Sequence, residues 1–144
     1  MLRKSLIASA FAALVAFSAA PALANGVYIQ QYGWGNAAGG VQTGWWNKFG
    51  VYQNGWFNNA VGHQNGWKNT TAIGQQGWNN SATTVQNGAW NGAGVGQFGS
   101  NHTAIITQDG YGNVAAGVQV GNGCHGNVVQ AGSGNVAAFV QTCP

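Results

Sequence analysis

The chain has very few charged residues. Charged side chains make up 3% of its 144 residues, and between residues 25 and 144 they are Lys48, Lys68 and Asp109. A single carboxylate excludes the paired carboxylates of acid–base catalysis, and two lysines do not form the basic surface of a nucleic-acid binder. The serines do not stand in a nucleophile elbow, and the glycines do not follow a phosphate-binding pattern. We therefore expect no enzyme, no cofactor, no resident metal and no nucleic-acid partner.

Leucine, glutamate, lysine and arginine, which favour helices, are also scarce, while glycine contributes 25 residues and asparagine recurs throughout. This composition argues against a helical protein. Low charge has a second consequence, because copies of such a chain repel one another little and tend to associate.

The longest apolar run lies at the N-terminus, within residues 1–24. Arg3 and Lys4 precede an apolar stretch from Leu6 to Phe17, and Ala22-Leu23-Ala24 gives the small-x-small pattern of a cleavage site. We interpret this segment as a secretory signal peptide. No later segment has the length and hydropathy of a transmembrane helix. We therefore expect the protein to be secreted.

Residues 25–144 read as one repeat domain in which glutamine returns every eleven residues. The glutamines are Gln31, Gln42, Gln53, Gln64, Gln75, Gln86, Gln97, Gln108, Gln119, Gln130 and Gln141. Glycine stands two places after each glutamine except the last. Asparagine stands five places after, with His102 and Cys124 as exceptions, at Asn36, Asn47, Asn58, Asn69, Asn80, Asn91, Asn113 and Asn135. A strict period of this kind is typical of stacked structural repeats.

Within a unit, the residues four and two places before glutamine share one face of a strand with the glutamine itself, as in Phe49-Val51-Gln53. The following Gly-x-x-Asn segment suits a tight turn, since glycine and asparagine tolerate positive φ. The sequence therefore predicts an all-β fold, a parallel β-solenoid of about five strand-turn-strand coils. Each coil holds 22 residues, or two 11-residue units.

A 22-residue period also appears two places before glutamine. Large residues alternate there with small ones, namely Ile29, Val51, Ile73 and Val95 with Gly40, Gly62 and Thr84. We expect a large residue on one strand to face a small one on the other, as a narrow core between two sheets requires.

Parallel, in-register stacking places glutamine on glutamine at about 4.8 Å. Each side-chain amide then donates to one neighbour and accepts from the other. The first and last coils keep unpaired amides and open strand edges, which a second copy can satisfy. The glutamines and asparagines are thus the candidate functional residues, and self-assembly is the predicted activity.

The segments Gln31-Tyr32-Gly33-Trp34-Gly35-Asn36-Ala37-Ala38 and Gln108-Asp109-Gly110-Tyr111-Gly112-Asn113-Val114-Ala115 resemble curlin repeats, and the resemblance extends over nearly all of residues 25–144. Curlins are the subunits of curli, the extracellular amyloid fibres of biofilm-forming bacteria. The resemblance implies a β-solenoid that forms a homopolymeric surface fibre, or fimbrium, for adhesion and biofilm matrix. It also implies other curli subunits and a curli-type outer-membrane secretion apparatus as partners, and the glutamine and asparagine rows as stacking residues.

Tryptophan follows the repeat glycine at Trp34, Trp56 and Trp78, which should stack along one edge, and at Trp45 and Trp67 along the other. Two interpretations remain open. The rings pack the turns, or they form an exposed strip that contacts surfaces, glycans or a partner fibre.

Cys124 takes an asparagine position and Cys143 a glycine position, at the same edge of neighbouring coils. Because an exported chain meets an oxidising compartment, we predict a disulfide between them. A weaker alternative is a zinc or copper site at His102, Cys124 and His125, whose spacing matches no recognised metal motif.

The alternative to a fibre subunit is a monomeric secreted β-solenoid that acts as an adhesin or glycan-binding module. Such a protein should have capped ends, and an ice binder would also need a regular threonine array that this chain lacks.

Overall fold

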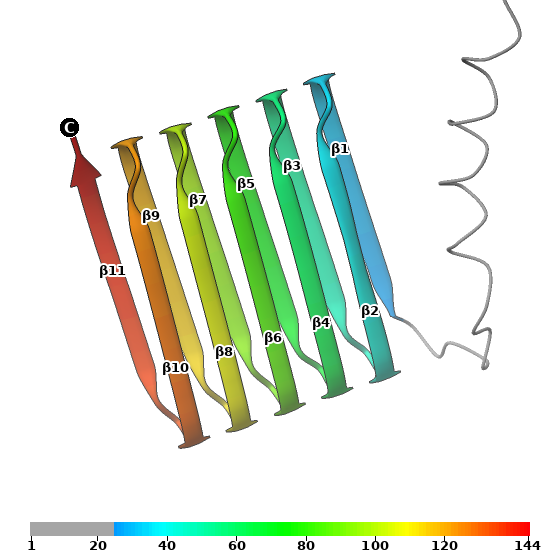
Figure 1. Cartoon of the computed structure of the whole chain (residues 1–144). Helices are drawn as coiled ribbons and strands as arrows, with labels where there is room; N and C mark the ends of the chain where they lie inside the picture. The colour runs from blue at the N-terminus through cyan, green and yellow to red at the C-terminus, as the bar shows by residue number, and fades with distance from the viewer. Residues whose placement is uncertain (1–24) are drawn as a thin grey trace, which may run out of the picture.

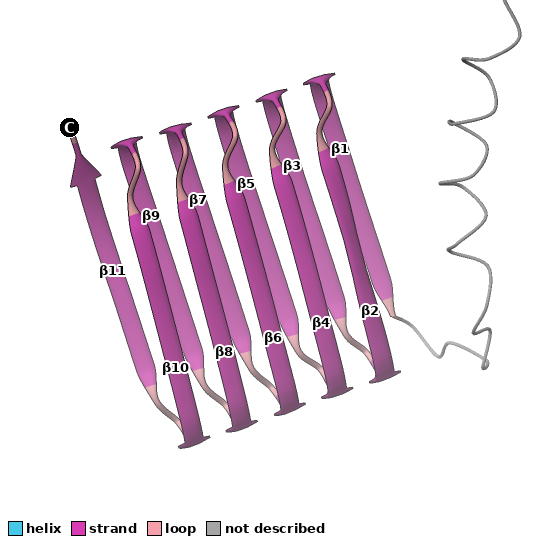
Figure 2. Cartoon of the chain, in the orientation of Figure 1, coloured by secondary structure: helices cyan, strands magenta, loops and turns pink. Residues whose placement is uncertain are grey.

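The computed structural model describes residues 25–144, and the predicted signal peptide at residues 1–24 lies outside this range. Eleven strands follow one another with two-residue corners between them (Figure 1). Figure 2 shows strands and short loops over the whole described range. The strands are β1 (Gly26–Trp34), β2 (Ala37–Trp45), β3 (Lys48–Trp56), β4 (Asn59–Trp67), β5 (Thr70–Trp78), β6 (Ser81–Ala89), β7 (Gly92–Ser100), β8 (Thr103–Tyr111), β9 (Val114–Asn122), β10 (His125–Ser133) and β11 (Val136–Cys143).

The strands form two parallel sheets that face each other. Odd-numbered strands make a six-stranded sheet in the order β1-β3-β5-β7-β9-β11, and even-numbered strands make a five-stranded sheet in the order β10-β8-β6-β4-β2. Gln31 pairs with Gln53, Gln53 with Gln75, and every later pair keeps the same 22-residue offset. The predicted parallel β-solenoid is therefore confirmed. Residues 25–144 contain no helix that is long and apolar enough to span a bilayer.

A thin core lies between the sheets, filled by the strand face that the alternation predicts. Val51, Ile73 and Val95 of the six-stranded sheet and Ala60, Ala82 and Ala104 of the five-stranded sheet are buried, while the residues between them face outward. The alternation of side chains in an extended strand thus places the glutamines inside as well.

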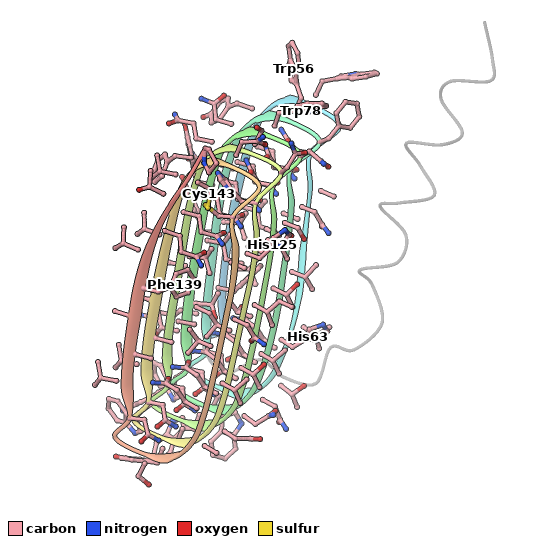
Figure 3. The ribbon with its side chains drawn as sticks, turned by 60° about the vertical axis from the view of Figure 1, so that its left-hand side comes forward. Trp56, His63, Trp78, His125, Phe139 and Cys143 are labelled. Carbon is pink, nitrogen blue, oxygen red and sulfur yellow. A yellow bond between two sulfur atoms is a disulfide. The ribbon has the colours of Figure 1, made fainter. Side chains whose placement is uncertain are left out.

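Two phenylalanines fill the space that glycines leave in this core. A Cβ at Gly62 would overlap the Phe49 ring, and a Cβ at Gly117 or Gly126 would overlap Phe139. Figure 3 shows Phe139 between the ribbons of the last coils. Large side chains do oppose small ones, but Phe49 stands four places before its glutamine and not two, because a strand and the one after it run in opposite directions.

The corners between strands differ from the prediction in which residue has the second positive φ. The strands continue through the repeat glycine, which has positive φ, and the second positive φ belongs to the residue before asparagine. Non-glycine residues hold this conformation at Trp46, Phe57, Lys68, Asn79, Trp90 and Asn101. Asparagine was expected to supply the positive φ, but its side chain is needed for hydrogen bonds between coils.

Candidate functional site

Two rows of inward-facing glutamines run the length of the core, buried from Gln53 to Gln130, and we call them the glutamine rows. Gln31, Gln53, Gln75, Gln97, Gln119 and Gln141 form one row, and Gln42, Gln64, Gln86, Gln108 and Gln130 form the other. Except in the last glutamine of each row, Nε2 donates to Oε1 of the glutamine 22 residues later, at 2.7–2.9 Å. The second N–H donates sideways to a backbone carbonyl of the facing strand, as from Gln75 to Asn59 at 2.9 Å.

These bonds satisfy the amides completely inside the stack. Gln75 donates twice, accepts from Gln53, and has only 1% of its surface exposed. Each hydrogen bond contributes about 1 kcal/mol net to the free energy of unfolding, and a buried amide without partners would cost more than that. Because each coil supplies the partners of the next, every coil stabilises its neighbour. Among residues 25–144, no buried side-chain nitrogen or oxygen lacks a partner.

The asparagines form a second set of rows at the corners, and these rows bind mainly to the backbone. The Oδ1 atom accepts from the backbone N–H 22 residues later, at 2.9–3.1 Å, and Nδ2 donates to a glycine carbonyl 19 residues later, at 2.9–3.1 Å. Asn25 begins one of these rows, since its Oδ1 accepts from the Asn47 N–H. It was missed because it precedes the first glutamine, although it stands eleven residues before Asn36.

The two exceptions in the asparagine rows are consecutive members of one row. The His102 N–H donates to Asn80 Oδ1, and the His102 Nδ1 accepts from the Cys124 N–H at 3.1 Å. Imidazole therefore replaces the amide oxygen as acceptor. Because Nδ1 accepts, the proton of the neutral ring lies on Nε2, which is 3.2 Å from the Phe98 carbonyl oxygen.

Cys124 and Cys143 are joined by a disulfide with Cα atoms 5.6 Å apart, and Figure 3 shows Cys143 at this end of the stack. The bridge links the corner after β9 to the end of β11. Across residues 25–144, no three His, Cys, Asp or Glu side chains are arranged to hold a metal ion. The alternative metal site is not supported, because Cys124 is bonded to Cys143 and the ring of His102 is engaged in its row.

The repeat glycines form a close-packed column beside each glutamine row. At Gly77, φ is +127°, and a Cβ there would overlap the carbonyl oxygen of Gly99 in the next coil. The same overlap recurs from Gly33 through Gly121. The column lets corner backbones stack at the strand spacing, which side chains would prevent.

Residues 78–110 match the family model described as the curlin associated repeat. The matched segment runs from the end of β5 to β8, in the centre of the stack, and the resemblance to curlin repeats is confirmed there. No curated protein matches the chain.

The repeats carry tryptophans along both edges of the stack. Trp34 pairs with Trp56 and Trp56 with Trp78 at one edge, and Trp45 pairs with Trp67 at the other. Figure 3 shows Trp56 and Trp78 projecting together from one edge. Their exposed fractions are 61% and 52%, so about half or more of each side chain is accessible at this edge.

Further aromatic residues, Trp46, Phe57 and Trp90, stand directly before an asparagine of the rows and were not predicted from the sequence. The Trp34 ring lies edge-on to Phe57, with 5.6 Å between centroids. Trp46 and Trp90 stand in the same position at the other edge, with Lys68 between them. Trp46, Lys68 and Trp90 follow one another at intervals of 22 residues, and this regular placement was the signal that could have identified the two tryptophans.

Proposed function

We propose that this chain is a secreted subunit of an extracellular curli-like fibre that grows by stacking coil on coil. A curlin associated repeat suggests a curli subunit, and curlins assemble into fibres at the cell surface. By the same resemblance, export uses a curli-type outer-membrane apparatus with other curli subunits, and the fibre serves adhesion and biofilm matrix.

The unequal ends of the glutamine rows are the observation that carries this proposal. Among residues 25–144, nothing donates to Oε1 of Gln31 or Gln42, while Gln130 and Gln141 each donate only to a backbone carbonyl. One end of the stack therefore presents acceptors and the other presents N–H donors. A second copy in the same orientation satisfies both and continues the pattern found inside the chain.

Fibre formation tests this proposal directly. The purified protein, incubated without agitation, is expected to form thioflavin-positive fibres with reflections at about 4.8 Å and about 10 Å. Gln31→Met should slow elongation because it removes an acceptor from an open end, whereas Gln30→Met, on the outward face next to it, should not. A chain that stays monomeric for days at high concentration would instead be the monomeric adhesin or glycan binder.

We also propose that the exposed tryptophans make the fibre adhesive. Replacing Trp34, Trp56 and Trp78 with serine is expected to leave assembly intact, because more than half of the surface of each side chain is exposed. Binding of fibres to an apolar or glycan-coated surface should fall by at least roughly tenfold, since three aromatic contacts of about 0.5–1.5 kcal/mol each are lost. The matched change at Trp45 and Trp67 tests the other edge, and loss of assembly in either variant would favour turn packing.

A further inference from the structure

Both lysines of residues 25–144 lie in one pocket at an edge of the stack. The pocket has a volume of about 270 Å³ and is lined by Lys48, Lys68, Thr70, Trp46 and Trp90. The single carboxylate side chain of the described range, Asp109, lies on β8, which β6 separates from β4. The cationic side chains of an otherwise nearly uncharged surface are thus concentrated between two indoles.

The backbone around this pocket adopts an unfavourable conformation to present these side chains. Trp46, Lys68 and Trp90 have φ of 63°, 56° and 61°, in the left-handed region. The same position of the other units holds glycine or asparagine, except for Phe57 at the opposite edge; these residues are Gly35, Asn79, Asn101, Gly112, Gly123 and Gly134. Bulky residues in this conformation are strained, and such strain clusters at binding sites. Three of them converge on one pocket.

The indole rings hold the lysine in place. Lys68 Nζ lies 4.1 Å from the centroid of the Trp90 ring and 5.3 Å from that of Trp67. The corners stack directly, because the Lys68 N–H donates to the Trp45 carbonyl and the Trp90 N–H to the Trp67 carbonyl. Lys48 and Thr70 are paired residues of β3 and β5 beside this stack. The pocket therefore combines one positioned ammonium group, the side chain of a second lysine, a hydroxyl and exposed aromatic faces.

We propose that this pocket binds a uronic acid residue of an acidic polysaccharide. An ammonium group pairs with the ring carboxylate in a charge-assisted bond, and the indoles cover the apolar face of the pyranose. Thr70 provides a partner for a sugar hydroxyl. The exposed position on an edge lets a long polymer run past it. Two ammonium groups suit one carboxylate better than the closely spaced phosphates of a nucleic acid.

The test uses tetragalacturonate as the probe, with the neutral galactose tetramer as its uncharged match. Tryptophan fluorescence and calorimetry of the purified protein should show binding of the acidic tetramer that weakens with added salt. Lys68→Asn and Lys48→Thr are each expected to weaken it by about tenfold, the loss typical of one charge-assisted bond. The repeat already holds asparagine and threonine at these positions, in Asn79 and Thr103, so both variants should fold.

Phe57→Asn is the matched control, because Phe57 has the same backbone conformation, with φ of 55°, at the opposite edge. It relieves the same strain and should leave tetragalacturonate binding unchanged. Equal binding of the neutral tetramer, or equal loss in Phe57→Asn, would overturn the proposal. Tighter binding of a single-stranded oligonucleotide through the same lysines would also overturn it and assign the pocket to nucleic acid. All residues of the pocket come from one chain, so the result does not depend on fibre formation.

Discussion

Replacement of Gly77 by alanine is expected to destabilise the solenoid by at least about 4 kcal/mol, the range of severe core defects. A Cβ at Gly77 would overlap the Gly99 carbonyl oxygen, and φ of +127° is unfavourable for any residue with a side chain. The neighbouring coils would have to separate, which would also break the hydrogen bonds of the glutamine row. Urea unfolding followed by circular dichroism measures the loss, and the variant should be largely unfolded at room temperature.

Gly94→Ala is the matched control in the adjacent β7. A Cβ at Gly94 would meet no heavy atom within 4 Å, and Ala72 and Ala116 occupy the same position in the neighbouring coils. Removing a glycine from a compatible conformation should stabilise the fold by about 0.4–1 kcal/mol, because the unfolded chain loses freedom. If Gly77→Ala unfolded no more readily than Gly94→Ala, close stacking of the glycine column would not be a requirement of the fold.

Replacement of Gln75 by methionine is expected to cost about 3–6 kcal/mol, although the two side chains have similar length and volume. The change leaves the Gln53 amide N–H, Gln97 Oε1 and the Asn59 carbonyl oxygen without their partners in a buried site. Each orphaned group costs about 1–3 kcal/mol. The same unfolding measurement gives the free energy, and loss of seeded growth should accompany it.

Gln76→Met is the matched control, because it makes the same substitution at an exposed glutamine of the same strand. Gln76 is the next residue of β5 and is exposed on the outer face of the sheet. Its replacement should change stability by less than about 0.5 kcal/mol, as is usual for surface positions. Equal effects at the two positions would contradict a structural role for the glutamine rows.

The sequence predicts the fold well because every unit repeats the same restraints. Gln31 pairs with Gln53 without a slip in register because a shift of one residue would move glutamine outside and unpair its amide. The alternation around Val51 and Gln53 likewise defines the buried face, and the 22-residue coil follows from two units per coil.

Contacts between residues that occupy different positions of the 11-residue repeat could not be predicted from the sequence. Phe49 fills the space beside Gly62, yet the two occupy different positions of their units. Lys48 and Lys68 share a pocket because a corner and a strand start lie beside each other in three dimensions, which a period of eleven does not reveal. The positive φ of Trp46 and Trp90 was missed because nothing in their chemistry suggests that conformation.

The common direction of the glutamine amides has an electrical consequence. Every bond of the two rows runs from a lower to a higher residue number, as from Gln53 to Gln75 and from Gln64 to Gln86. Strands themselves contribute only a small net dipole, but aligned amides add, at about 3.5 D each. The stack therefore carries a dipole moment along its axis, and this moment grows with every added copy. Two such stacks lying side by side attract each other when they point in opposite directions.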